Sequence, residues 1–282
     1  MNNIREVLAE GTSLLKESKN ASETPFLDAL LLLSFILKIP KEKLLASYPD
    51  LLDASDYTTF IDMVKKRINN TPVSYLINQK EFFGLNFYVD ENVLVPRPDS
   101  ETLVEKALDI IEKSDRIKNV LDLCSGSGAL GIALKYTNPN INVSCSDISE
   151  EAVTICRKNS NKILGKELNI IQSNLFDKIK EKFDLIITNP PYLTTHETSD
   201  MMGTGWKEPG IALDGGVDGL EFIKKIIDIS PDYMNKNAYL LIESSIDQTN
   251  TIKNLLDSGV FYNTSISKDL SGRNRVTIGQ RI

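Results

Sequence analysis

The strongest constraint on the fold is an alternation of strand-like and helix-like segments that starts near residue 100 and continues to the end of the chain. The pattern predicts strands at 119–124, 141–147, 168–172, 183–188 and 238–243, followed by a final pair at 259–267 and 273–280 joined by a turn. It predicts helices at 100–113, 129–136, 150–164, 218–229 and 246–256. Such alternation is typical of an α/β domain in which a mostly parallel sheet is covered by helices on both faces.

Residues 1–78 carry helical patterns and no strand pattern, so we expect a separate N-terminal helical domain. A helical stripe is formed by Ile4, Leu8, Leu14 and Leu15. Thr24-Pro25 is typical of an N-cap followed by proline at the first helical position. The almost uniformly apolar segment 26–37 is expected at the centre of a small bundle, and a third helix is expected at 55–69.

Between these parts, residues 79–97 are expected to form a linker that contains a β-hairpin. Phe82–Asp90 and Val93–Pro96 alternate in polarity and are separated by a short polar turn. The α/β domain is then expected to occupy residues 98–282. Its stretch from Thr194 to Val217 has no regular pattern, and loops of that length usually carry function.

Composition favours a soluble cytoplasmic protein. The formal net charge of −7 is unfavourable for non-specific nucleic-acid binding, which needs clustered Lys and Arg. The three cysteines have no CxxC or metal-like spacing, which is typical of a reducing compartment. The N-terminus does not resemble a signal peptide, and the longest apolar run, residues 29–37, is too short to cross a bilayer. We therefore expect no membrane association and no metal site.

A glycine-rich segment follows the predicted strand 119–124 at the point where a helix begins. Ser125-Gly126-Ser127-Gly128 gives the backbone freedom to turn sharply and approach a ligand closely. Asp147 ends the next strand, where its carboxylate could accept hydrogen bonds from ribose hydroxyls, and Asp122 lies where it could hold a cationic amino-acid group. The spacing also fits a dinucleotide site, so an NAD-type oxidoreductase is a competing interpretation.

The segment Asn189-Pro190-Pro191-Tyr192 ends the predicted strand 183–188. Neither proline has a backbone N–H, and residues before proline are held in extended conformations. The result is a stiff turn that presents one amide side chain and bare backbone carbonyls. These acceptors suit a substrate that carries an NH2 group. Together with the glycine segment, they favour S-adenosylmethionine as the cofactor over NAD.

Further motifs lie on both sides of these two. Val95-Pro96-Arg97-Pro98-Asp99-Ser100-Glu101 precedes the first helix of the α/β domain, and Glu208-Pro209, Ala212-Leu213-Asp214-Gly215-Gly216 and Asp218-Gly219-Leu220 lie in the long loop. Lys268-Asp269-Leu270-Ser271-Gly272-Arg273 and Arg275-Val276 lie near the C-terminus. With these motifs, the chain from about Pro72 onward resembles the release factor glutamine methyltransferases, which methylate a glutamine side-chain amide on peptide chain release factors.

The resemblance implies a Rossmann-like class I methyltransferase domain with a seven-stranded sheet, and an N-terminal domain that recognises the substrate. The expected partners are release factors, modified in their Gly-Gly-Gln loop, with no direct role for nucleic acid. Expected cofactor-binding residues are Asp122, Cys124, Ser125, Gly126, Ser127, Gly128, Asp147, Asn174, Leu175 and Asn189. Expected substrate-binding residues are Arg97, Glu101, Asn189, Pro190, Pro191 and Tyr192.

The chain departs from the family pattern at three places. Cys124 stands where many class members have glycine, Asn174-Leu175 replaces a frequent Asp-Trp, and Ser244-Ser245 replaces Ile-Gly after Glu243. Asn-Pro-Pro-Tyr is also shared with methyltransferases that act on exocyclic amines of DNA and RNA. A ribosomal-protein glutamine, a nucleic-acid amine and a non-catalytic cofactor-binding role therefore stay open as alternatives.

The expected catalytic residues are Asn189, Pro190 and Tyr192. The Asn189 side-chain oxygen and the Pro190 carbonyl would each accept one N–H of the substrate amide, which would orient its nitrogen for attack on a methyl group. Tyr192 would pack along the substrate and exclude water. Arg97 and Glu101 would either line the site or fasten the hairpin to the next helix. The sequence assigns no role to Glu243, His196 or Trp206.

Overall fold

The computed structural model describes residues 3–18 and 22–282. The chain forms two compact units. The first contains the residues up to Gln79 together with Met202–Lys207, and the second contains Lys80–Met201 and Glu208–Ile282.

The first unit is helical. Its helices are α1 (Ile4–Glu17), α2 (Pro25–Leu37), α3 (Lys41–Ala46), α4 (Ala54–Ile68) and α5 (Val73–Leu76). Helix α1 begins with a capping box, in which the Asn3 side chain accepts from the Glu6 backbone N–H and the Glu6 carboxylate accepts from the Asn3 N–H. Its buried stripe contains Val7 and Gly11 and leaves Leu14 exposed, so the expectation for Leu14 was wrong.

A buried charge pair ties the helices of the first unit together. The Arg67 Nε lies 2.7 Å from the Asp28 carboxylate, and Asp28 is almost fully buried. Thr24 occupies the N-cap position of α2, but its hydroxyl donates to Asp28 rather than accepting from the helix backbone. Asp28 therefore connects α2, α4 and the preceding turn. The short helices α3 and α5 were not predicted.

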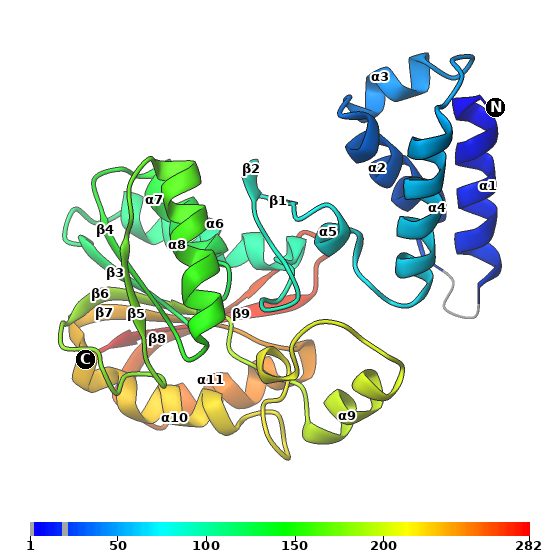
Figure 1. Ribbon diagram of the computed structural model, residues 1–282. Coiled ribbons are helices and arrows are strands. Elements are labelled where there is room, and N and C mark those ends of the chain that lie inside the picture. The colour runs from blue at the N-terminus through cyan, green and yellow to red at the C-terminus, as the bar shows by residue number, and fades with distance from the viewer. Residues whose placement is uncertain (1–2, 19–21) are drawn as a thin grey trace. The chain divides into compact units, whose positions relative to one another are not determined.

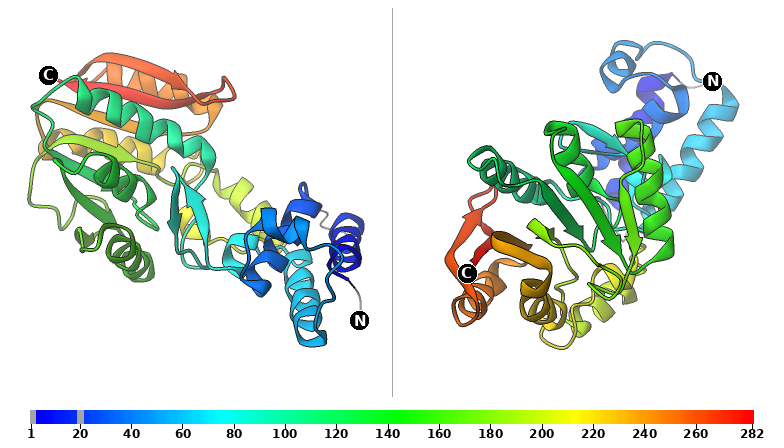
Figure 2. Two further views of the ribbon diagram at one scale, coloured as in Figure 1. Left: turned by 90° about the horizontal axis from the view of Figure 1, so that it is seen from above. Right: turned by 90° about the vertical axis from the view of Figure 1, so that its left-hand side faces the viewer.

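The second unit is built on a seven-stranded sheet with the order β5-β4-β3-β6-β7-β9-β8. Figure 1 and Figure 2 show helices on both sides of this sheet. The strands are β3 (Asn119–Leu123), β4 (Asn142–Asp147), β5 (Asn169–Gln172), β6 (Phe183–Thr188), β7 (Met234–Glu243), β8 (Phe261–Lys268) and β9 (Asn274–Arg281). Strands β3 to β7 pair in parallel, whereas β9 runs antiparallel to both β7 and β8. The predicted mostly parallel sheet is confirmed.

Helices cover both faces of this sheet because successive strand residues point to opposite sides. Val120 packs on the face covered by α6 (Glu101–Glu112), α7 (Ala129–Thr137) and α8 (Glu150–Leu164). Leu121 packs on the other face, against α10 (Glu221–Ile229) and α11 (Thr249–Asp257). Both cores are apolar, as expected for a parallel sheet that is buried on both sides.

Two local predictions in this unit were wrong. The hairpin consists of β1 (Lys80–Phe82) and β2 (Leu85–Phe87), and residues 93–96 form no strand. Phe83 and Gly84 both have positive φ values, 51° and 70°, as a tight two-residue hairpin turn requires. The second error concerns the stretch 194–217, which contains the helix α9 (Thr195–Gly203) and a short 3-10 turn at Gly210–Ala212.

The remaining 3-10 turns are Pro98–Ser100 (η1), Ser230–Tyr233 and Ile246–Gln248. Within the described residues, no helix is long and apolar enough to span a bilayer.

Candidate functional site

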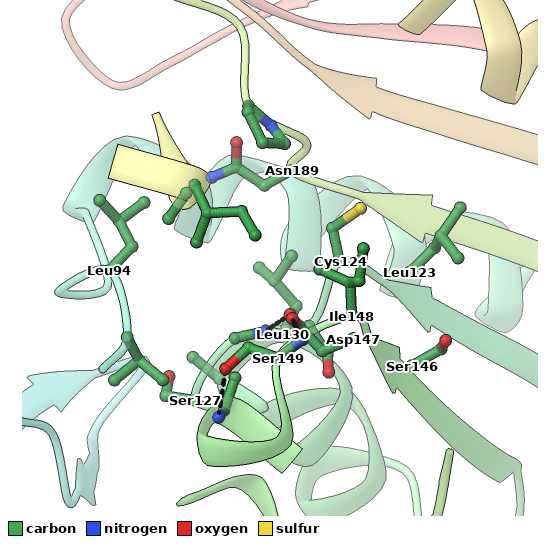
Figure 3. A pocket seen from close by; sticks show the side chains of 18 of the residues that line it. Leu94, Leu123, Cys124, Ser127, Leu130, Ser146, Asp147, Ile148, Ser149 and Asn189 are labelled. Carbon is green, nitrogen blue, oxygen red and sulfur yellow. Dashed lines mark hydrogen bonds between the residues drawn. The ribbon is translucent and has the colours of Figure 1, made fainter. Parts of the chain in front are cut away.

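A deep pocket lies at the carboxyl ends of β3, β4 and β6, where the strand order of the sheet reverses. This is where open α/β sheets bind ligands. About 1130 Å³ of space lies within the pocket when the open solvent at its mouth is included. Figure 3 shows Asn189 on one side of the pocket and Asp147 with Ser149 on the other.

The glycine-rich segment forms the floor of the pocket as a tight turn between β3 and α7. The Gly128 N–H donates to the Ser125 carbonyl at 2.8 Å, and the Ser125 N–H donates to the Ser146 carbonyl on β4 at 3.0 Å. Cys124 enters the turn with a φ of 59°, a left-handed conformation in which glycine is more comfortable. A glycine would adopt the same conformation at lower cost.

Asp147 fixes the same turn from the end of β4. One carboxylate oxygen accepts from the Gly126 N–H at 2.7 Å and the other from the Ser149 N–H at 3.0 Å. A carboxylate has about four acceptor positions, so two backbone donors leave capacity for two ligand hydroxyls. Burial raises the pKa of Asp147, and its backbone hydrogen bonds oppose that rise.

Asp122 lies beneath the turn rather than on the pocket wall. It is fully buried, and one of its oxygens accepts from the Gly131 N–H in α7 at 2.8 Å. Its other oxygen has no hydrogen-bond partner among the described residues, and burial raises the pKa of Asp122 to about 7. Asp122 therefore supports the glycine-rich turn from the side away from the pocket. This placement disfavours the predicted direct contact between Asp122 and a ligand amino group.

The remaining walls combine apolar side chains with two unpartnered hydroxyls. Leu130, Ile148 and Leu175 give an apolar surface suited to a purine ring. The Ser125 and Ser146 hydroxyls line the pocket and are buried without hydrogen-bond partners among the described residues. Buried hydroxyls normally have partners, so these two groups lack hydrogen bonds that the folded chain would be expected to supply.

The Asn189-Pro190-Pro191-Tyr192 segment leaves β6 and is held by its backbone. Gln248 donates to the Tyr192 carbonyl at 2.8 Å. One residue further on, the Leu193 N–H donates to the Leu213 carbonyl and the Gly215 N–H donates back to Leu193. The segment 212–216 thus holds the backbone that follows the two prolines. These hydrogen bonds fix Asn189 at the edge of the pocket.

The Asn189 side chain is oriented by a buried pair behind it. Its amide nitrogen donates to the Ser100 hydroxyl at 3.2 Å, and that hydroxyl donates to the Glu243 carboxylate at 3.0 Å. Because the nitrogen is engaged there, the amide oxygen is the group left to accept from a ligand. Ser100 and Glu243 were not among the predicted site residues, although Ser100 lies in the motif that starts at Val95.

Arg97 and Glu101 have different surroundings. Arg97 lines the pocket and forms an ion pair with the buried Glu208, which also accepts from the Val95 N–H at 2.9 Å. Glu101 accepts from the Phe83 N–H at 2.8 Å, so it fastens the hairpin to α6. Of the two alternatives for Glu101, the contacts support fastening.

Most of the predicted site residues meet at this pocket. Those on its wall are Arg97, Cys124, Ser125, Gly126, Ser127, Asp147, Asn174, Leu175, Asn189 and Pro191. Asp122, Gly128, Glu101, Pro190 and Tyr192 lie next to it and do not line it. His196 is exposed and lies 3.2 Å from Asp200, and Trp206 belongs to the segment grouped with the first unit.

Sequence reasoning missed Ser146 and Ile148, because serine and isoleucine in or just after a strand give no distinctive signal. It also missed Asn159 of α8, which is fully buried and binds the Tyr88 backbone and the Ser127 carbonyl. An asparagine on the mostly apolar face of α8 that contains Val153 and Cys156 was the available clue.

Comparisons with known proteins agree with this geometry. The methyltransferase small domain family matches residues 100–205, and the PrmC N-terminal domain family matches residues 6–77. A release factor glutamine methyltransferase from Clostridium acetobutylicum is 32% identical over 99% of this chain and 98% of its own length. The chain belongs to the release factor glutamine methyltransferase family.

Other relatives support the same family and fold. A release factor glutamine methyltransferase from Borreliella burgdorferi is 38% identical over 90% of this chain and 89% of its own length. Among solved structures, a methyltransferase from Pyrococcus furiosus aligns with a TM-score of 0.52 at 16% identity, covering 78% of this chain and 98% of that one. The last similarity concerns the fold alone.

Proposed function

We propose that this chain transfers a methyl group from S-adenosylmethionine to the side-chain amide nitrogen of a glutamine in the Gly-Gly-Gln loop of peptide chain release factors. The observation that carries the proposal is the orientation of Asn189, whose amide nitrogen is bound to Ser100 so that its oxygen is left as an acceptor at the pocket edge. An acceptor in this position suits a substrate that presents N–H groups.

The side chains that line the pocket support S-adenosylmethionine as the cofactor. The apolar surface of Leu130, Ile148 and Leu175 would hold the adenine, and Asp147 would accept from the ribose hydroxyls. The unpartnered Ser125 hydroxyl would bind the amino-acid end. When bound, S-adenosylmethionine supplies an electrophilic methyl group on a sulfonium.

The protein contributes orientation and electrostatics to the reaction. A carboxamide nitrogen is a poor nucleophile because its lone pair is delocalised into the carbonyl. The Asn189 oxygen and the Pro190 carbonyl would each accept one substrate N–H, which holds the nitrogen in place and favours the positive charge that develops there. Tyr192 would flank the substrate side chain. Burial raises the pKa of Tyr192, as does the nearby Glu243 charge, so its hydroxyl stays neutral.

The helical first unit would recognise the release factor, since it matches the N-terminal domain of the family. A cytoplasmic location would accord with a release factor as substrate.

The proposal is tested with purified release factor and a tritiated methyl donor. Label is expected on the release factor and is expected to disappear when its Gly-Gly-Gln glutamine is replaced by alanine. Label on a ribosomal protein or on RNA, or calorimetry that detects binding of NAD and not of S-adenosylmethionine, would overturn the assignment.

Asn189→Ala is expected to lower the single-turnover methyl-transfer rate by roughly 10²–10³-fold, the range seen when one preorganised polar group is removed from an active site. The rate is measured by rapid quench with saturating cofactor. The exposed Asn254 of α11 provides a matched control, and Asn254→Ala is expected to leave the rate unchanged. Near-normal transfer by Asn189→Ala would contradict the mechanism.

A further inference from the structure

Three polar side chains from distant parts of the sequence form a hydrogen-bonded relay that runs from the pocket wall, at Asn189 and Ser100, to the buried Glu243. Asn189 follows β6, Ser100 ends the turn η1, and Glu243 ends β7. Ser100 is 4% exposed and Glu243 is 1% exposed. Buried carboxylates are unfavourable unless they are paired, so the position of Glu243 at this point needs a physical account.

The chemistry of the three groups fixes the direction of every hydrogen bond. An ionised carboxylate only accepts, so the Ser100 hydroxyl must donate its single proton to Glu243. The Ser100 oxygen is then available only as an acceptor, and it receives an N–H from Asn189. The opposite orientation of Asn189, with its oxygen on Ser100, would place two acceptors together. The relay therefore permits one orientation of the Asn189 amide.

We propose that Ser100 and Glu243 are positioning residues for methyl transfer, in which the ionised Glu243 carboxylate orders the Ser100 hydroxyl and so presents the Asn189 oxygen to the substrate amide. This inference rests on the proposed function. The negative charge also polarises the Asn189 amide, which makes its oxygen a better acceptor for a substrate N–H that becomes positive during transfer.

The charged and titratable groups around Glu243 come from several elements. Arg275 of β9 contributes a positive charge, and Asp99 of η1 contributes a negative one. Tyr192, in the segment after β6, is near enough for the Glu243 charge to affect its own pKa. The Arg275 Nη2 lies 2.7 Å from the Asp99 Oδ2 and 3.6 Å from the Asp269 Oδ2. The positive charge of Arg275 is therefore largely balanced by those two carboxylates.

The protonation state of Glu243 consequently changes near neutrality. Burial raises the pKa of Glu243 to about 7, and the Asp99 charge adds to that rise. The Ser100 hydrogen bond, the Arg275 charge and a smaller hydrogen-bond interaction with the Asn189 side chain itself oppose it. Above this pKa the carboxylate orders the relay as described. Below it, the carboxyl group becomes a donor, Ser100 is free to donate to the Asn189 oxygen, and the acceptor is withdrawn from the substrate.

The first test compares Glu243→Gln, Ser100→Ala and Ser100→Thr with the parent protein. Single-turnover methyl transfer to release factor is measured from pH 5.5 to 9, and cofactor affinity is measured by calorimetry. Glu243→Gln is expected to bind cofactor within about threefold of the parent while transferring methyl roughly 10–100-fold more slowly. The parent rate should rise with pH through about 7, and this rise should vanish in Glu243→Gln.

Ser100→Ala is expected to show a similar rate loss, and Ser100→Thr, which retains the hydroxyl, is expected to recover most of the rate. The exposed Glu105 of α6 provides the matched control, and Glu105→Gln should behave as the parent. The positioning role is wrong if the parent protein methylates release factor and either variant, Glu243→Gln or Ser100→Ala, has the same transfer rate and pH profile as the parent.

A second measurement does not depend on the substrate. The Asn189 side-chain amide resonances, assigned by their absence in Asn189→Ala, are followed by nitrogen-15 NMR over the same pH range. They should shift with a midpoint near 7 in the parent and not in Glu243→Gln. If the parent protein shows this shift but does not methylate release factor, the proposed substrate is wrong and the relay still stands. If the resonances do not shift with pH, the relay is wrong.

Discussion

Gly128 is a residue at which neighbouring side chains leave no room for a Cβ. Its φ is 79°, and a Cβ placed there would lie 2.5 Å from the Cys156 sulfur and 2.9 Å from the Ile132 Cδ1. Both neighbours are buried in the core beneath the cofactor turn. The shape of the turn is therefore set from below by packing as well as by its own hydrogen bonds.

Gly128→Ala is expected to lower the free energy of unfolding by more than the roughly 1–2 kcal/mol that left-handed backbone costs a non-glycine residue, because a steric overlap is added. It should also weaken cofactor binding. Gly165 has a similar φ of 68° with open space around it, so Gly165→Ala isolates the backbone contribution. Urea unfolding and calorimetry measure both effects. Equal stability losses in the two variants would contradict the packing argument.

Among the elements, α8 is joined to the cofactor turn and to the segment after the hairpin through one side chain. Asn159 accepts from the Tyr88 N–H at 2.7 Å and donates to the carbonyls of Tyr88 at 3.0 Å and Ser127 at 2.9 Å. Only an amide side chain can make these three contacts together, because an ionised carboxylate could accept from Tyr88 but has no N–H to donate to the two carbonyls. Asn159 thus ties α8 to two other pieces of backbone.

Asn159→Asp is expected to destabilise the protein by at least about 2 kcal/mol at pH 8, because two carbonyls lose their donor and a charge is buried. The loss should be smaller at pH 5, where the new carboxyl group takes up a proton. Asn161, exposed on the same helix, provides the control Asn161→Asp. Urea unfolding at the two pH values measures the difference, and a pH-independent loss would show that the buried charge is not the cause.

The strands and helices of the second unit could be predicted from the sequence because burial on both faces imposes an apolar pattern, as in Val120 and Leu121. The hairpin turn at Phe83-Gly84 was missed because phenylalanine rarely adopts a positive φ and does not signal a turn. Helix α9 was missed because it is mostly exposed, with Thr198 its only buried residue. An exposed helix has no apolar stripe to reveal it.

For the site, the motifs Ser125–Gly128 and Asn189–Tyr192 could be predicted because their glycines and prolines have local backbone effects. The relay through Ser100 and Glu243 could not be predicted, since it depends on residues 143 positions apart meeting in space. Asp122 illustrates the converse. Its spacing from the glycines was visible, but only the tertiary structure shows that its carboxylate points to α7.

At the scale of the whole molecule, two buried carboxyl groups make stability depend on pH. Burial raises the pKa of both Asp122 and Glu243 to about 7, from ordinary values of 3.8 and 4.5. Between the ordinary and the raised values the folded state binds these protons and the unfolded state does not. The stabilisation is complete below the ordinary pKa and is lost as the pH rises through 7.

The free energy of unfolding is therefore expected to fall between pH 5 and pH 8. Each unit by which folding raises the pKa of a carboxyl group corresponds to about 1.4 kcal/mol, which is lost as that group deprotonates. Urea unfolding at intervals across this range measures the slope. Asp122→Asn removes one of the two groups and should give a shallower slope. Stability that stays constant, or increases with pH, would contradict this expectation.

The position of β9 in the sheet has a consequence for biosynthesis. This strand follows all the others along the sequence, yet it lies between β7 and β8. The pocket is lined by residues no later than Phe222, whereas Arg275, which faces Glu243, arrives with β9. A nascent chain could thus enclose the nucleoside half of its ligand while still lacking the cation beside the relay. The sheet itself would be completed only after the ribosome has released that inner strand.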